Sequence, residues 1–127
     1  MFGDGNRRLG VLTDAGCGTP HIEAMLSGVD ALVLECNHDA AMLENGPYPP
    51  MLKRRVGGRF GHLENSQSAA LLAKLKHGGL KCVIAAHVSK KNNTDALARR
   101  ALARALDCAD DEVRVACQTT GFDWIRI

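Results

Sequence analysis

The stretch Ala31-Leu32-Val33-Leu34-Glu35-Cys36-Asn37-His38-Asp39 decides the fold, because an unbroken apolar run ends abruptly in polar side chains. Such a run predicts a strand that is buried on both faces, which is typical of parallel strands in an α/β sheet. Residues 80–86 repeat the pattern and end at His87. The sequence therefore predicts a layered α/β domain with these two strands at its centre.

Helical patterns alternate with these strands. Thr19 and Pro20 predict a capped helix that runs to residues 27–28. Three further helices are predicted by a capping residue followed by a helical pattern: residues 39–45, Asn65 or Ser66 to residue 76, and a long helix capped by Asn93 or Thr94. At the N-terminus, Phe2 and residues 9–13 predict a hairpin whose first strand is nearly missing, and at the C-terminus residues 112–118 and 122–127 predict a closing hairpin.

The overall composition sets broad limits. A length of 127 residues fits one domain, and the balance of 16 basic and 14 acidic residues neither indicates nor excludes nucleic acid as a partner. No apolar stretch approaches the roughly 20 residues that span a bilayer, so we expect a cytoplasmic protein without a membrane partner. The five cysteines include no C-x-x-C pair. We therefore expect structural thiols, with Cys36, Cys82 and Cys117 buried in strands, rather than a disulfide framework or zinc knuckle.

Chemically active side chains gather where the predicted strands end. Asp14 follows the apolar residues 11–13, Glu35 closes the strand at residues 31–34, and His87 closes the strand at residues 80–86. Strand ends are where ligands collect in α/β sheets, and carboxylate and imidazole groups suit zinc or manganese. Each residue alone has a simpler interpretation, such as a turn for Asp14, but together they favour a functional site.

Two short motifs resemble the metallo-β-lactamase fold. Leu12-Thr13-Asp14-Ala15-Gly16 resembles its fourth metal-binding motif, whose aspartate bridges two metals, and Ala85-Ala86-His87-Val88-Ser89 resembles its fifth, a terminal histidine ligand. A longer ordered set resembles the YycJ/WalJ-like branch of that superfamily, which is related to ribonuclease Z: residues 34–39, 46–50, 52–55, 61–63 and 92–94.

The resemblance implies the C-terminal half of an αββα sandwich, with a mixed sheet flanked by helices, over residues 1–127. The superfamily signature His-x-His-x-Asp-His supplies most metal ligands, and the histidines at 21, 38, 62, 77 and 87 do not have its spacing. We therefore expect that the N-terminal half of the domain is absent from this chain.

The resemblance also implies an activity, which is that of a phosphodiesterase or 5′-exonuclease-like nuclease with two zinc or manganese ions in its complete form. It assigns Asp14 and His87 as metal ligands. It places His62 near the scissile phosphate with Glu35 supporting it. His38 and Asp39 are candidate supporting groups or ligands, and the simpler role for Asp39 is that of a helix cap. Lys53, Arg54 and Arg55 either contact the nucleic-acid backbone or form a solvated helix face.

Two hypotheses remain open at this point. The first is an incomplete enzyme that binds metal weakly at most and is inactive by itself, because two ligands are fewer than a stable site needs. The second is a non-catalytic α/β remnant or binding module that forms a homodimer through an exposed sheet face.

Overall fold

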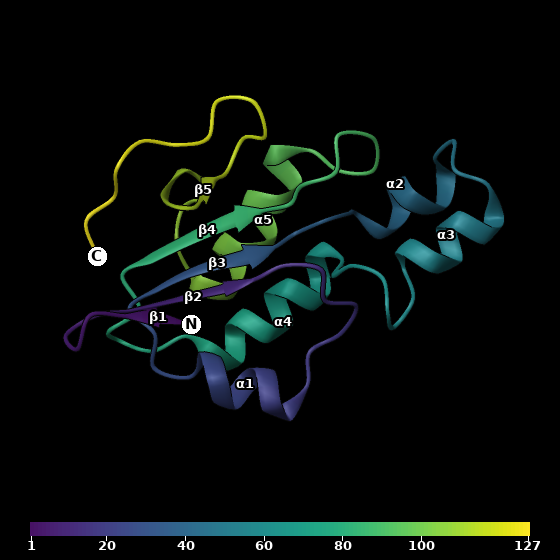
Figure 1. Ribbon diagram of the computed structural model, residues 1–127. Coiled ribbons are helices and arrows are strands. Elements are labelled where there is room, and N and C mark those ends of the chain that lie inside the picture. Colours follow the sequence, from purple (N-terminus) through teal and green to yellow (C-terminus); the bar gives the residue numbers. More distant parts are fainter.

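The computed structural model covers residues 1–127 and contains a five-stranded mixed sheet (Figure 1). The strands lie in chain order: β1 (Phe2–Gly3), β2 (Arg8–Leu12), β3 (Ala31–Glu35), β4 (Cys82–Ala86) and β5 (Arg114–Val115). β1 is antiparallel to β2, and the other neighbours are parallel. The predicted α/β class, the mixed sheet and the very short first strand are thereby confirmed.

Three helices cover one face of the sheet, namely α1 (Pro20–Leu26), α4 (Asn65–Leu75) and α5 (Asp95–Leu106) (Figure 1). The core lies between them and the sheet and is built from alternate residues of β3 and β4 together with apolar helix residues: Leu26, Leu32, Leu34, Leu71, Leu72, Leu75, Val83, Ala85, Ala98 and Leu102. Burying each large side chain contributes about 1.5–3 kcal/mol, so this layer stabilises the strands that carry the site. None of the helices combines the length and apolar character needed to cross a membrane.

The helices begin largely where the sequence predicts. The side chains of Thr19, Asp39 and Thr94 accept hydrogen bonds from backbone amides of the first turns of α1, α2 (Ala40–Asn45) and α5. The predicted cap of α4 at Asn65 or Ser66 is wrong, because the N-cap is Glu64. Asn65 is instead buried, where it exchanges two amide hydrogen bonds of 2.9 and 2.8 Å with Asn93. The basic segment that precedes α4 in the chain forms a further helix, α3 (Pro50–Val56).

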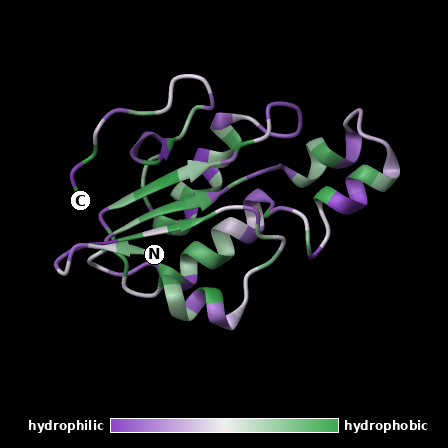
Figure 2. Ribbon diagram, viewed as in Figure 1, coloured by the Kyte–Doolittle hydropathy of each residue, from purple (hydrophilic) through white to green (hydrophobic).

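The other face of the sheet has no helical cover. The ribbon of the central strands is coloured as largely hydrophobic (Figure 2), and residues 122–127 lie against this face without forming a strand. Ala31, Val33 and Ile84 line an apolar cavity of about 440 Å³ between the sheet and this segment.

The predicted closing hairpin is wrong. Only Arg114–Val115 forms a strand, beside β4, and a single bridge joins Cys117 to Gly121. The alternating apolar side chains of the last segment, such as Ile125 and Ile127, line the cavity over the sheet face rather than pairing at its edge. Cys117 is exposed, so its predicted burial is also wrong, whereas Cys36 lies in the core as expected.

Candidate metal centre

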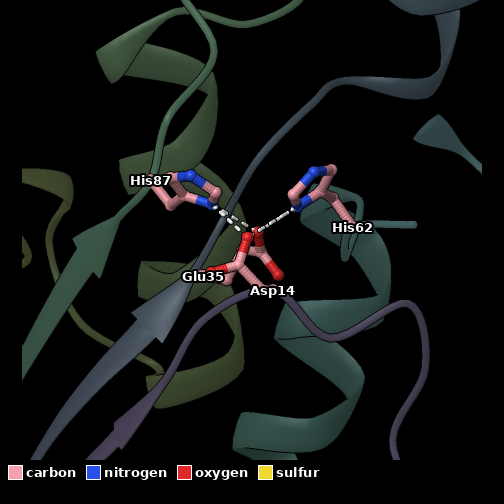
Figure 3. Close-up of side chains that lie close together, drawn as sticks. All are labelled: Asp14, Glu35, His62 and His87. Atoms are coloured by element: carbon pink, nitrogen blue, oxygen red, sulfur yellow. Dashed lines mark hydrogen bonds and ion pairs between the residues drawn. The ribbon is translucent and has the colours of Figure 1, made fainter. Parts of the chain in front are cut away.

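Four side chains converge where the parallel strands end (Figure 3). Asp14 follows β2, Glu35 ends β3, His87 follows β4, and His62 lies in the loop before α4. Each offers one potential ligand atom, and these atoms all lie within 4.8 Å of one another. The strand-end residues that the sequence groups into one candidate site thus lie together, because the parallel arrangement brings the carboxyl ends of β2, β3 and β4 to one edge.

Glu35 is the fully buried base of this cluster. Its Oε1 atom lies 2.8 Å from Nδ1 of His62 and 2.7 Å from Nδ1 of His87. Its Oε2 atom accepts hydrogen bonds from the backbone amides of Ala15 (3.0 Å) and Leu63 (3.4 Å). A carboxylate offers about four acceptor positions, so Glu35 in its ionised form can accept from Nδ1 of both rings as well as from both amides. Glu35 is therefore satisfied although buried, and it fixes the orientation of both histidines.

Asp14 is the exposed member of the cluster, with 69% of its side chain accessible. Its Oδ1 atom lies 3.7 Å from Nδ1 of His62 and 3.8 Å from Nδ1 of His87. Asp14 and His87 both adopt left-handed backbone conformations, with φ of 59° and 54°. Such conformations cost of order 1–3 kcal/mol each and concentrate at functional sites. Two of the four cluster residues are thus held in strained geometry at the points where their strands end.

Close backbone packing fixes the loops that carry Asp14 and His62. A Cβ atom on Gly16 would lie 2.1 Å from the carbonyl oxygen of Arg59, and one on Gly61 would lie 2.1 Å from that of Val56. Only glycine fits at either position. The loop after β2 and the loop before α4 therefore lie against each other, which sets the distance between Asp14 and His62.

A second set of contacts fixes the loop that carries His87. Asn37 donates a hydrogen bond from Nδ2 to the carbonyl oxygen of His87 (3.0 Å), and its own carbonyl accepts from the amide of Ser89 (2.8 Å). The ring centroids of His62 and His87 are 5.1 Å apart at an angle of 65°. The two imidazoles thus face the same small space from opposite sides.

His38 and Asp39 lie outside the four-residue cluster. His38 is buried, its Nδ1 atom lies 3.3 Å from Oδ1 of Asn37, and burial lowers the pKa of its imidazole. The Asp39 carboxylate accepts a hydrogen bond from the amide of Met42 at the start of α2. Asp39 thereby fills the simpler role of a helix cap, and a supporting role for either residue stays a prediction.

The three basic residues of α3 occupy different surroundings. Lys53 donates a hydrogen bond from Nζ to the carbonyl oxygen of Glu44 at 2.5 Å, and Arg54 is exposed. Arg55 lines a cavity of about 360 Å³ together with Asp14 and His62. Only Arg55 therefore lies beside the cluster, and nucleic-acid contacts by the three stay a prediction.

A second, polar cavity of about 330 Å³ that His62 also lines was not predicted from the sequence. Its lining includes His87, Ser89, Lys90, Lys91 and Tyr48, and Nζ of Lys91 lies 5.9 Å from the centre of the Tyr48 ring. The two lysines follow the strand-end residue His87 by three and four positions in the sequence, and this proximity is a signal that could have identified them. Tyr48 lies too far away in the sequence to be placed there without the fold.

The donor set suits a divalent cation. Two carboxylates and two imidazoles within 4.8 Å of one another match the oxygen and nitrogen ligands of zinc and manganese. The ring nitrogen of each histidine that faces Asp14 is the same Nδ1 atom that contacts Glu35, so a metal held between Asp14 and His87 would take the place of the proton on that nitrogen. The residues present therefore fit a possible metal site, although Glu35 is already occupied by its hydrogen bonds.

The chain is homologous to known nucleases. It is 35% identical over 106 residues to exodeoxyribonuclease YycJ of Bacillus anthracis, over 84% of this chain and 40% of that protein. It is 31% identical over 100 residues to exodeoxyribonuclease WalJ of Streptococcus pneumoniae strain D39, over 79% of this chain and 37% of that protein. These are metallo-β-lactamase-fold proteins, so the resemblance noted in the sequence is confirmed.

The chain spans only about 37–40% of the length of these curated relatives. No protein-family model matches the chain, and no solved structure matches it either.

Proposed function

We propose that this chain carries part of the active site of a metal-dependent phosphodiesterase that degrades DNA. The observation that carries the proposal is the convergence of Asp14, Glu35, His62 and His87 at one sheet edge. Homology to two exodeoxyribonucleases supports DNA as the substrate. The uncovered second face of the sheet supports the further proposal that residues 1–127 form the C-terminal half of an αββα sandwich.

Asp14 and His87 are the proposed metal ligands. Asp14 presents an accessible carboxylate, and His87 is oriented by its hydrogen bond to Glu35. A bound zinc or manganese ion would supply Lewis acidity and a water with a lowered pKa. The strained backbone at both positions supports this assignment, because strain of this kind is retained where side-chain placement matters.

His62 is the proposed catalytic residue, and Glu35 is the proposed positioning residue. The hydrogen bond from Nδ1 of His62 to Glu35 leaves the second ring nitrogen directed away from the carboxylates (Figure 3). When the ring is protonated, this nitrogen can donate to a phosphate oxygen or to the leaving oxygen. Glu35 holds the ring in the orientation that this transfer needs, because its own position is fixed by two backbone amides.

The number of ligands limits what this chain does by itself. A transition-metal site usually needs three or four protein ligands, and two metals need more. Asp14 and His87 provide two. We therefore propose that the remaining ligands come from outside residues 1–127, that the chain alone binds metal weakly, and that its turnover alone is far below that of a complete site.

The test compares the chain with a longer protein in which it is joined to a histidine-rich N-terminal region of a YycJ relative. Release of nucleotides from DNA is measured with zinc and with manganese. We expect metal-dependent release by the longer protein, at least about 100-fold lower after Asp14→Ala, and little release by residues 1–127 alone. Activity that persists after Asp14→Ala would overturn the proposal.

One observation favours a second candidate function, which is a non-catalytic module that forms a homodimer. The sheet face over the 440 Å³ cavity is apolar, and the side chain of Trp124 beside it is fully exposed. Exposed apolar patches mark interaction surfaces. Sedimentation of the purified chain separates the two candidates: a stable dimer that Asp14→Ala and added metal both leave unchanged, with no nuclease activity in the longer protein, would favour the module.

A further inference from the structure

Asn37 lies just beyond β3, between the two loops that carry the histidines of the candidate metal centre. Its backbone amide donates a hydrogen bond to the carbonyl oxygen of Leu63 (3.0 Å), in the loop before α4. Its backbone carbonyl accepts from the amide of Ser89 (2.8 Å), in the loop after β4. Any residue other than proline can make these two backbone contacts. The contribution that is specific to asparagine is therefore made by the side chain.

The side-chain amide of Asn37 holds the backbone of His87. Its Nδ2 atom donates a hydrogen bond of 3.0 Å to the carbonyl oxygen of His87, and that oxygen has no other hydrogen bond in the structure. His87 has a left-handed backbone with a φ of 54°, which is disfavoured because Cβ approaches the following carbonyl oxygen. A residue in this conformation leaves the strand ladder, so its carbonyl needs a partner elsewhere. The Asn37 amide supplies that partner and so supports the conformation that aims the His87 ring at the centre.

His38 fixes the direction of the Asn37 amide. The carbonyl oxygen of His87 can only accept, so the NH₂ group of Asn37 faces it and the Oδ1 atom faces the other way. That Oδ1 atom lies 3.3 Å from Nδ1 of His38, and because an amide oxygen also only accepts, the ring nitrogen donates. His38 is only 2% exposed, and its own carbonyl accepts from the amide of Asn65 (2.9 Å). A turned amide would lose both contacts, so His38 keeps the donor directed at His87.

We propose that Asn37 is a positioning residue that holds His87 in its ligating conformation, and that His38 orients the Asn37 amide for this role. The inference rests on the proposed function, because it takes His87 to be a metal ligand. It gives His38 a supporting role without contact to the metal. Removing an outer hydrogen-bond partner of this kind typically weakens metal binding by about 10–100-fold. A single segment after β3 thus supplies both groups that act on the backbone of His87, directly after Glu35, which orients its ring.

The first test uses the metal-free chain. Asn37→Asp keeps the shape and both backbone contacts but places an oxygen where the amide donated. NMR coupling constants measure the backbone φ of residue 87, and nitrogen shifts measure the ring tautomers. We expect His87 to lose its left-handed φ and its preference for a proton on Nδ1. His62 should not change, because Asn37 contacts its loop only through the backbone.

An unchanged φ and an unchanged tautomer of His87 in Asn37→Asp would overturn the inference. Asn37→Ala removes the donor without adding a charge, and it is measured in the same way. It decides the question if the aspartate variant does not fold.

The second test titrates the 127-residue chain with zinc and follows the same histidine signals. Asn37→Asp and Asn37→Ala should each weaken zinc binding by about 10–100-fold. Asn65→Ala is the matched control, because it removes a buried amide that is hydrogen-bonded to Asn93 rather than to His87. It should lower the stability of the fold but change zinc affinity by less than about twofold. Equal losses of zinc affinity in the Asn37 and Asn65 variants would reflect lost stability alone and would contradict the positioning role.

A double-mutant cycle tests His38. His38→Leu should weaken zinc binding by about threefold and should have no further effect in a chain that already carries Asn37→Ala. The same effect in both backgrounds would show that His38 acts independently of Asn37, and its assigned role would be wrong. If the unaltered chain takes up no zinc at His87, the proposed function fails, and the metal-free spectra still decide whether Asn37 positions His87.

Discussion

His87 donates a hydrogen bond from Nδ1 to Oε1 of Glu35 over 2.7 Å, and Glu35 has no accessible surface. The same oxygen accepts from Nδ1 of His62 at 2.8 Å. A single buried carboxylate thus orients a proposed ligand and a proposed catalytic residue. In its ionised form this carboxylate can only accept, and the neutral form of each ring then carries its proton on Nδ1.

The ring tautomers give the first prediction. Nitrogen NMR spectra of the metal-free chain should show that His62 and His87 are protonated on Nδ1 in their neutral forms, while an exposed histidine such as His21 shows the usual mixture. In Glu35→Gln this bias should disappear for at least one ring, because an amide oxygen accepts less strongly than a carboxylate. Protonation on Nε2 in the unaltered chain would show that Glu35 does not orient the rings.

The stability of the fold should depend on the same carboxylate. Glu35→Gln keeps the volume but places an NH₂ group opposite N–H donors, so buried donors lose their acceptor. We expect the free energy of unfolding in urea to fall by about 1–3 kcal/mol. Glu44→Gln, at an exposed position, is the control and should change stability by less than about 0.5 kcal/mol. Equal stability of the two variants would contradict the proposed hydrogen-bond arrangement.

Because the backbone at Asp14 is left-handed, two substitutions at this position should differ in stability but not in metal binding. Its φ of 59° suits glycine, whereas alanine there is strained. Asp14→Gly should therefore be more stable than Asp14→Ala by about 1 kcal/mol in thermal or chemical unfolding. Both variants should lose metal binding to the same extent, because both lack the carboxylate. If the two variants unfold alike, the left-handed conformation is not a source of strain.

Much of the site follows from the sequence because strand ends are recognisable there. The apolar runs before Asp14, Glu35 and His87 predict parallel strands, and parallel strands place their ends together. The distance between Asp14 and His62 is different. It depends on the contact of Gly16 with the backbone of Arg59, which joins loops that are distant in the sequence. No local pattern encodes such a contact.

The incorrect predictions have equally physical causes. Residues 122–127 alternate like a strand, but the uncovered sheet face offers them apolar contact without strand pairing. Asparagine is a residue type that often caps helices, but the side-chain amide of Asn65 is hydrogen-bonded to that of Asn93. In both cases a tertiary contact replaced the local preference.

The cysteines should differ sharply in reactivity. Hydrogen bonds from Thr119 and Thr120 lower the pKa of the exposed Cys117 thiol to about 6, and burial raises that of Cys36 to about 12. Since the thiolate is the reactive form, alkylation of Cys117 should rise with pH through a midpoint near 6 and be largely complete before Cys36 reacts. Peptide mass mapping measures this. Thr119→Val should move the midpoint to higher pH, and an unchanged midpoint would contradict the stated cause.

The central claim is that Asp14 and His87 hold a divalent metal at the sheet edge, and calorimetric titration of the chain with zinc tests it most directly. We expect weak uptake of one ion per chain, lost in Asp14→Ala and in His87→Ala and retained in Asp123→Ala, which removes an exposed carboxylate elsewhere. Zinc uptake that is unchanged by Asp14→Ala and by His87→Ala would show that the ion binds elsewhere, and the cluster would then not be a metal centre.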